Sequence, residues 1–295
     1  MIEKKRWFYS DGVELAGAFY LPDQPVDASR PLVLPCSGFT GMGRIHPARF
    51  SRALTARGWP CFIFDYRGFP PSGGTPGRVL IEEQLRDIRH AAAFASSDEE
   101  LGPRELVLLG WGMAGGMVLP AARGLSNLRG LVCVNGFYDA QRVQRALRGE
   151  DNWQRFCEWV EQDRLNRVLQ PDPVEVDPFS IYPLDRVSRR YVDEVLRRVP
   201  DYEGDKVHSL FADSLLDFAP EQRLEHLSQT PLLIAHGDAN ALHPVEEARS
   251  LHQRYPGPKQ LHWIEGGGHT EWMADDHPLF LALIERISAW LAELG

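Results

Sequence analysis

Residues 110–116 read GWGMAGG, and they follow directly on the short apolar run ELVLL at 105–109. The next residues, MVLPAARGL at 117–125, have the apolar spacing of a helix. The stretch therefore predicts a buried strand that passes through a tight glycine turn into a helix. Units of this kind are typical of α/β proteins, in which helices cover a mostly parallel sheet.

The same alternation extends from this stretch in both directions. The order predicts an α/β fold with a mostly parallel, eight-stranded sheet flanked by helices. The expected strands are 31–36, 60–66, 105–109, 128–136, 231–237 and 259–269, after an opening hairpin through Asp11-Gly12, and the expected helices include 46–58, 79–96, 243–255 and 277–294.

Residues 139–227 interrupt this order. The segment is charged, mostly helical in pattern and proline-rich in its middle, and it is too long for a connecting loop. We expect a helical cap over the carboxyl ends of the strands, where open α/β sheets bind ligands. The core then consists of residues 1–138 and 228–295. A peripheral helical lobe without a ligand role is the alternative.

Composition limits the possible partners. The chain has 295 residues, 43% of them hydrophobic, and a formal net charge of −9, which disfavours nucleic acid or an anionic membrane as a partner. The N-terminal residues contain no apolar signal region, and no run approaches a membrane span, so we expect a cytoplasmic protein. The four cysteines show no CxxC pair or metal-ligand spacing, and we expect no cofactor. No pattern favours a particular oligomeric state.

Four stretches together resemble the α/β-hydrolase superfamily, near its dipeptidyl-aminopeptidase-like and dienelactone-hydrolase-like branch. They occur in the order that the superfamily shows. The four are PCSGFTG at 35–41, DYRGFPPSGG at 65–74, GWGMAGG at 110–116, and AHGDANALHP at 235–244 followed by EGGGHTEWM at 265–273.

The resemblance implies a degenerate Ser-Asp-His triad. The nucleophile position of the G-x-S-x-G elbow falls on Gly112, the acid position on Asn240, and the histidine on His269. Glycine keeps the strained turn but supplies no hydroxyl. An amide can hold an imidazole but cannot stabilise an imidazolium. Asp238 is the alternative acid if the alignment shifts by two residues, and Asp139 is a further alternative.

The resemblance also implies an oxyanion hole formed by the N–H groups of Phe39 and Met113. We expect Ser37, Thr40, Trp111 and Asp139 to contact substrate, although hydroxyls such as those of Ser37 and Thr40 more often fasten their own loop. The remaining histidines are expected to be mostly surface or capping residues. They include His46, His90, His208, His236, His243 and His262, of which His243 lies nearest to the acid loop.

These features leave several functions open. The preferred hypothesis is an enzyme that acts without an acyl intermediate: His269 is a base with a pKa near 6.5, and it acts with the oxyanion hole on a small carbonyl compound in elimination, cyclisation or C–C/C–O cleavage. One alternative is a pseudo-hydrolase that binds a ligand without turnover. Others are hydrolysis by a His-activated water, and a serine hydrolase whose nucleophile has been replaced.

Overall fold

The computed structural model describes residues 1–99 and 101–294. Eight strands form one sheet in the order β1-β2-β4-β3-β5-β6-β9-β10. β1 pairs antiparallel with β2, and β2 antiparallel with β4, while every other neighbouring pair is parallel. The predicted fold class is confirmed, and so is the opening hairpin, whose turn residues Asp11 and Gly12 have φ angles of 50° and 82°.

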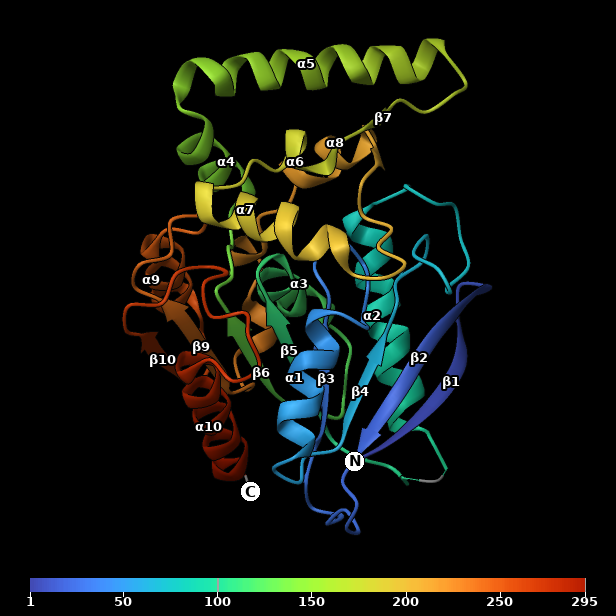
Figure 1. Ribbon diagram of the computed structural model, residues 1–295, viewed down its shortest axis with the longest axis vertical. Coiled ribbons are helices and arrows are strands. Elements are labelled where there is room, and N and C mark those ends of the chain that lie inside the picture. Colours follow the sequence, from blue (N-terminus) through green and yellow to red (C-terminus); the bar gives the residue numbers. More distant parts are fainter. Residues whose placement is uncertain (100, 295) are drawn as a thin grey trace.

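The elements of the core alternate along the chain as the sequence predicts (Figure 1). They are β1 (Ile2–Ser10), β2 (Val13–Leu21), β3 (Leu32–Cys36), α1 (His46–Thr55), β4 (Cys61–Phe64), α2 (Ile81–Ser96), β5 (Leu106–Trp111), α3 (Met113–Ala121), β6 (Leu128–Val134), β9 (Leu232–Gly237), α9 (Val245–Arg254), β10 (Lys259–Ile264) and α10 (Pro278–Glu293).

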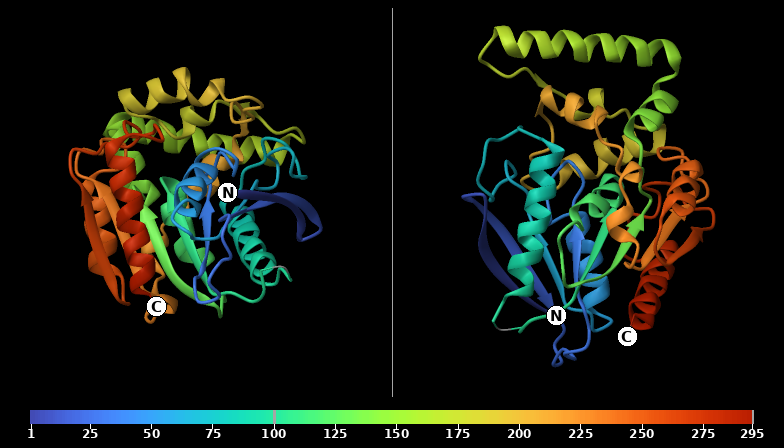
Figure 2. Two further views of the ribbon diagram at one scale, coloured as in Figure 1. Left: turned by 60° about the horizontal axis from the view of Figure 1, so that its bottom comes forward. Right: turned by 180° about the vertical axis from the view of Figure 1, so that it is seen from behind.

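Helices cover both faces of the sheet because the central strands are apolar on both sides. In β5, Leu106 and Leu108 pack into the apolar cluster that contains α2, α3 and α9. Val107 and Leu109 point the other way, into the cluster that contains α1 and α10. The two layers are visible on opposite sides of the strands in Figure 2. A sheet buried on both faces leaves the ends of its strands as the places where a site can open.

Residues 139–227, here called the insertion, lie over the end of the sheet to which the parallel strands run (Figure 1). A salt bridge attaches the insertion to the core, since Arg142 of α4 contacts Glu247 of α9 at 2.5 Å. Arg142 also contacts Glu221, within the insertion, at 2.6 Å. Its elements are α4 (Ala140–Arg148), α5 (Glu150–Leu169), β7 (Glu175–Val176), α6 (Pro178–Ile181), α7 (Arg186–Glu194), β8 (Val207–His208) and α8 (Leu210–Leu216).

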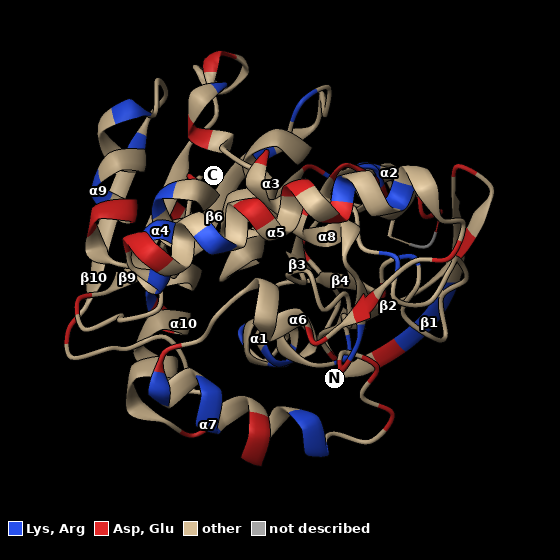
Figure 3. Ribbon diagram, turned by 90° about the horizontal axis from the view of Figure 1, so that it is seen from above, with Lys and Arg blue, Asp and Glu red and all other residues tan. Residues whose placement is uncertain are grey.

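The surface of the insertion carries charges of both signs. Figure 3 shows basic and acidic residues interspersed along α4, α5 and α7 rather than gathered by sign. Within residues 1–99 and 101–294, no helix is both long enough and apolar enough to cross a bilayer. All four cysteines are free thiols, and those at 36, 61 and 133 are buried in the core.

Candidate active site

Gly112 forms the turn between β5 and α3. Its φ and ψ angles are 62° and −130°, in a region that residues with a side chain rarely adopt. Neighbouring glycines allow the close approach of strand and helix, because a Cβ at Gly110 would lie 2.1 Å from the Ala114 carbonyl oxygen. The turn thus has the elbow geometry that the sequence predicts.

His269 faces this turn. A Cβ built at Gly112 would lie 3.5 Å from His269 Nε2, which is an ordinary contact distance. The space for a short side chain is therefore present, and a hydroxyl on that Cβ would reach the imidazole. The structure brings together the two positions that the resemblance assigned to nucleophile and histidine, and only the nucleophilic atom is missing.

Asn240 contacts the other ring nitrogen of His269, with its Nδ2 3.3 Å from Nδ1. The orientation of the amide is fixed by its other end, because Asn240 Oδ1 accepts hydrogen bonds from the N–H groups of Leu242 and His243. Nδ2 can only donate, so His269 Nδ1 is the acceptor. In a neutral imidazole the proton then sits on Nε2 and points toward Gly112. The sequence predicted a base at Nε2, whereas this arrangement makes it a hydrogen-bond donor.

The two alternative acids lie elsewhere. Asp238 is exposed, and its carboxylate accepts from the Gly266 N–H at 2.7 Å. Asp139 caps α4, accepting from the Arg142 N–H at 3.0 Å. The alternatives that made either residue the partner of His269 are wrong. Each carboxylate accepts a hydrogen bond from a backbone N–H, and the residue that contacts the imidazole is Asn240. Asp139, which was expected to contact substrate, does not line the cavity that opens beside Gly112 and His269.

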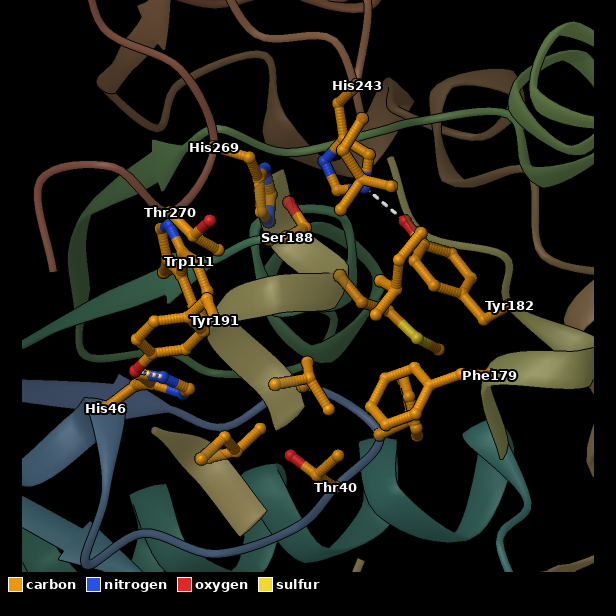
Figure 4. Close-up of a pocket in the computed structure, with 18 residues that line it drawn as sticks. Thr40, His46, Trp111, Phe179, Tyr182, Ser188, Tyr191, His243, His269 and Thr270 are labelled. Atoms are coloured by element: carbon orange, nitrogen blue, oxygen red, sulfur yellow. Dashed lines mark hydrogen bonds between the residues drawn. The ribbon is translucent and has the colours of Figure 1, made fainter. Parts of the chain in front are cut away.

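A cavity of about 90 Å³ opens beside Gly112 and His269 (Figure 4). Thr40 and Trp111 line it as expected, but Ser37 does not, because Ser37 is buried below the loop with its carbonyl accepting from Tyr66. The core supplies Gly38, Phe39, Thr40, His46, Trp111, Gly112, Met113, Leu242, His243, His269 and Thr270, and the insertion supplies Phe179, Tyr182, Leu184, Ser188, Tyr191, Val192 and Leu196.

Two tyrosines of the insertion are hydrogen-bonded to core histidines at this cavity. The Tyr191 hydroxyl lies 3.0 Å from His46 Nε2. The Tyr182 hydroxyl bonds His243 Nε2, and it is the donor, because His243 Nδ1 donates to the Asn135 carbonyl at 2.6 Å. The expectation that His46 and His243 are surface or capping residues is wrong. No local pattern distinguishes them, since the contacts join residues far apart in the chain.

Trp111 lies between two imidazoles. Its ring centroid is 4.5 Å from that of His46 and 4.9 Å from that of His269. The His243 ring meets His269 edge-on at 4.5 Å. Two aromatic rings, those of Trp111 and His243, therefore contact His269, whose side chain is buried.

This burial keeps the histidines neutral. Burial lowers the pKa of His269 well below 6.5, and the neighbouring His243, His236 and His46 lower it further. Burial also lowers the pKa of His243 to about 3 and that of His46 to about 3. The value near 6.5 expected for His269 is wrong, because the sequence does not reveal how completely the insertion and the other histidines desolvate the ring.

The backbone also offers donors to this cavity. Phe39 and Met113 both line it, and among the described residues neither N–H donates to another protein group. Met113 is the first residue of α3, whose leading N–H groups have no intrahelical acceptor. With His269 Nε2–H, the site presents three N–H groups around one space. The described residues contain no cluster of three metal-ligating side chains.

The sequence profile of the family described as serine aminopeptidase, S33, matches residues 27–275. The chain belongs to this S33 family of α/β-hydrolases. The match covers β3 to the loop after β10, and so includes the elbow, the acid loop and the histidine loop. In this S33 family member the residue at the turn between β5 and α3 is Gly112.

Relatives of this S33 family member support the family and its fold. The quorum-quenching protein AidA of Acinetobacter baumannii is 24% identical over 268 residues, covering 88% of this chain and 86% of AidA. Two solved structures share the fold. Hypothetical protein PA2218 of Pseudomonas aeruginosa has a TM-score of 0.83 at 19% identity, covering 100% of this chain and 94% of that one. The α/β hydrolase GrgF of Penicillium sp. sh18 has a TM-score of 0.79 at 17% identity, covering 99% of both.

Proposed function

We propose that this chain binds a small, mostly apolar carbonyl compound and polarises its C=O group for chemistry that forms no acyl-enzyme. The observation that carries the proposal is the orientation of Asn240, which places the His269 proton on Nε2, facing the Gly112 turn. A carbonyl oxygen seated there would accept from His269 and from the Met113 and Phe39 N–H groups.

The three donors would act on the electronic structure of the carbonyl. Donors fixed in a water-excluded site stabilise negative charge that develops on oxygen, and they need no reorganisation during the reaction. A neutral imidazole serves this purpose as an electrophile and as a proton donor to the oxygen. The reactions that fit are additions, eliminations and cyclisations in which an enolate or alkoxide forms.

The absence of an acyl intermediate follows from the elbow. Glycine offers no hydroxyl, and no cysteine, lysine or carboxylate stands among the described residues that line the cavity. The serine that lines it, Ser188, lies on the insertion and donates its hydroxyl to Asp185 at 2.6 Å rather than to His269. A nucleophile or base would then come from the substrate itself, from a water, or from His46. Most lining residues are apolar or aromatic, which matches a compound with few polar groups.

Binding without turnover is the second candidate. It is favoured by the same lining, because a pocket with donors but no carboxylate base holds a carbonyl well and has little with which to remove a proton. In that case the S33 fold would serve as a receptor for the compound.

The test follows the bound carbonyl directly. Butyrophenone labelled with carbon-13 at its carbonyl should show a downfield shift when it binds, since hydrogen bonds withdraw electron density from that carbon. His269→Ala should remove much of the shift and weaken binding about tenfold, as expected for a lost hydrogen bond of about 1.4 kcal/mol. His269→Gln, which retains an N–H donor, is the matched control and should keep part of the shift.

An equal shift in the wild type and His269→Ala would refute the assignment of His269 as donor. Turnover decides between the two candidates. Mass spectrometry of a panel of ketones, enones and hydroxyketones after incubation should reveal a product for a ligand that also binds. Tight binding across the panel with no product would favour the receptor.

A further inference from the structure

Two polar atoms at the cavity lack a partner in the protein. They are Trp111 Nε1 and Thr270 Oγ1, and both are buried without a hydrogen-bond partner among the described residues. Both residues line the cavity, and Thr270 is only 6% exposed. Buried polar groups in folded proteins almost always have a hydrogen-bond partner. Two buried atoms without such a partner at the same cavity therefore point to a ligand that supplies it.

The two atoms lie beside the carbonyl site. Trp111 precedes Gly112 at the elbow, and Thr270 follows His269 in the histidine loop. The elbow and the histidine loop therefore supply these two polar atoms as well as groups of the carbonyl site. Figure 4 draws Trp111 and Thr270 on the His269 side of the cavity, and the Trp111 and His269 rings lie 4.9 Å apart. Both residues therefore border the space in which a ligand at Gly112 would lie.

The chemistry of the pair defines what it would bind. An indole N–H only donates, and a threonine hydroxyl both donates and accepts. An oxygen that accepts from Trp111 and exchanges a hydrogen bond with Thr270 satisfies both. Because Trp111 and Thr270 carry no charge, a neutral oxygen, a ketone or a hydroxyl, suits the site better than a carboxylate, whose burial without a cation is unfavourable.

We infer that Trp111 and Thr270 form a second polar subsite, and that the ligand is bifunctional, with a ketone or hydroxyl oxygen a few bonds from the carbonyl held at Gly112. Diketones and hydroxyketones are the chemical class. This inference rests on the proposed function for its first oxygen. The second subsite adds the feature that would distinguish such compounds from simple ketones of the same size.

The experiment compares two matched ligands. Benzoylacetone and butyrophenone share the phenyl ketone and the chain length, and they differ in the second oxygen. Wild-type protein should bind benzoylacetone at least tenfold more tightly by calorimetry. Thr270→Val keeps the shape of its side chain and Trp111→Phe keeps an aromatic ring, and each removes the polar atom. Each should reduce the preference to less than threefold.

His269→Ala separates this inference from the proposed function. It should weaken both ligands equally and preserve their ratio. If His269→Ala weakens the binding of neither ligand, the proposed carbonyl site is wrong. The ratio of the two affinities still tests the second subsite in that case. No preference in the wild type, or a preference that survives both Thr270→Val and Trp111→Phe, would overturn the bifunctional ligand.

Stability of the ligand-free protein gives a readout that needs no ligand. Because the Thr270 hydroxyl is unpaired, Thr270→Val should keep or raise the Tm. Thr55→Val is the matched control, since the buried Thr55 hydroxyl donates to the Tyr20 carbonyl at 3.2 Å away from the cavity, and its loss should lower the Tm. A fall in Tm for Thr270→Val equal to that of Thr55→Val would show that the Thr270 hydroxyl has a partner within the protein, and would overturn the subsite even if neither ligand binds.

Discussion

Asn240 Nδ2 lies 3.3 Å from His269 Nδ1, and this contact places the imidazole proton on the other ring nitrogen from the one that carries it in a serine hydrolase. A carboxylate at this position accepts from Nδ1–H and leaves a lone pair on Nε2 to act as base. The amide donates instead, because its oxygen already accepts from the Leu242 and His243 N–H groups. Nε2 then carries the proton. The asparagine and the elbow glycine are thus consistent with each other, since an elbow without a side chain offers Nε2 no hydroxyl to deprotonate.

Asn240→Asp should reverse the tautomer. The aspartate can keep one oxygen on the Leu242 and His243 N–H groups and turn the other toward His269 Nδ1. The proton would move from Nε2 to Nδ1, and the pKa of His269 would rise because a carboxylate stabilises the imidazolium. Nitrogen-15 NMR of labelled histidine measures both changes. Detection of Nδ1–H in the wild type would contradict the assigned orientation of Asn240.

Gly112→Ser should restore a hydroxyl but little reactivity. A Cβ fits there at 3.5 Å from His269 Nε2, yet Nε2–H cannot accept the serine proton. Labelling by a fluorophosphonate should stay weak in the single variant and increase at least tenfold in Gly112→Ser with Asn240→Asp. Full labelling of the single variant would show that His269 is already a base.

Gly112→Ala serves as the control for strain in these variants. A side chain at a φ of 62° costs on the order of 1–3 kcal/mol, and alanine and serine should lose about the same free energy of unfolding. The comparison separates the effect of the hydroxyl from that of the turn.

The buried histidines should make the protein sensitive to acid. Burial lowers the pKa of His243 to about 3, that of His236 to about 4, and that of His269 well below 6.5. Above about pH 6.5 these rings are neutral in both states. As the pH falls below 6.5, the unfolded chain gains protons that the native protein does not, so each ring lowers the free energy of unfolding by about 1.4 kcal/mol per pH unit until its folded pKa is reached.

Urea unfolding between pH 7 and about pH 4 measures this slope. Asp65, whose pKa burial raises to about 6, takes up a proton in the native state and offsets part of the loss. The decisive comparison is therefore between the wild type and one variant. His243→Gln should reduce the slope by about one proton. The same slope in the wild type and in His243→Gln would refute the neutral cluster.

Asn135 should prove essential for positioning the histidine loop. This fully buried side chain accepts from the Gly237 N–H at 2.8 Å and donates to the Gly268 carbonyl at 3.0 Å. Asn135→Gly tolerates the φ of 48° but leaves the Gly237 N–H without its acceptor. It also removes one of the two donors to the Gly268 carbonyl, which keeps the Trp272 Nε1–H at 3.0 Å, and the change should cost at least about 2 kcal/mol. Asn152→Ala, on exposed α5, is the control and should change stability by less than about 0.5 kcal/mol. A loss below about 1 kcal/mol for Asn135→Gly would contradict this role.

Local patterns in the sequence predict much of the fold. Apolar runs such as ELVLL identify strands buried on both faces, and the glycines of 110–116 identify a turn that no other residue type fits as easily. Four such stretches in one order were enough to place Gly112, Asn240 and His269 near one another. These features depend on neighbours in the chain, which is why they can be found without the structure.

The tertiary structure decided the chemistry of the site. Which end of the Asn240 amide faces His269 depends on two backbone N–H groups, and the low pKa of the imidazole depends on rings from three separate segments. Tyr191 and His46 meet across 145 positions of the chain, and no periodicity reports such a contact. Desolvation and hydrogen-bond direction are set by every group that surrounds an atom, and those groups come together only when the insertion packs over the sheet.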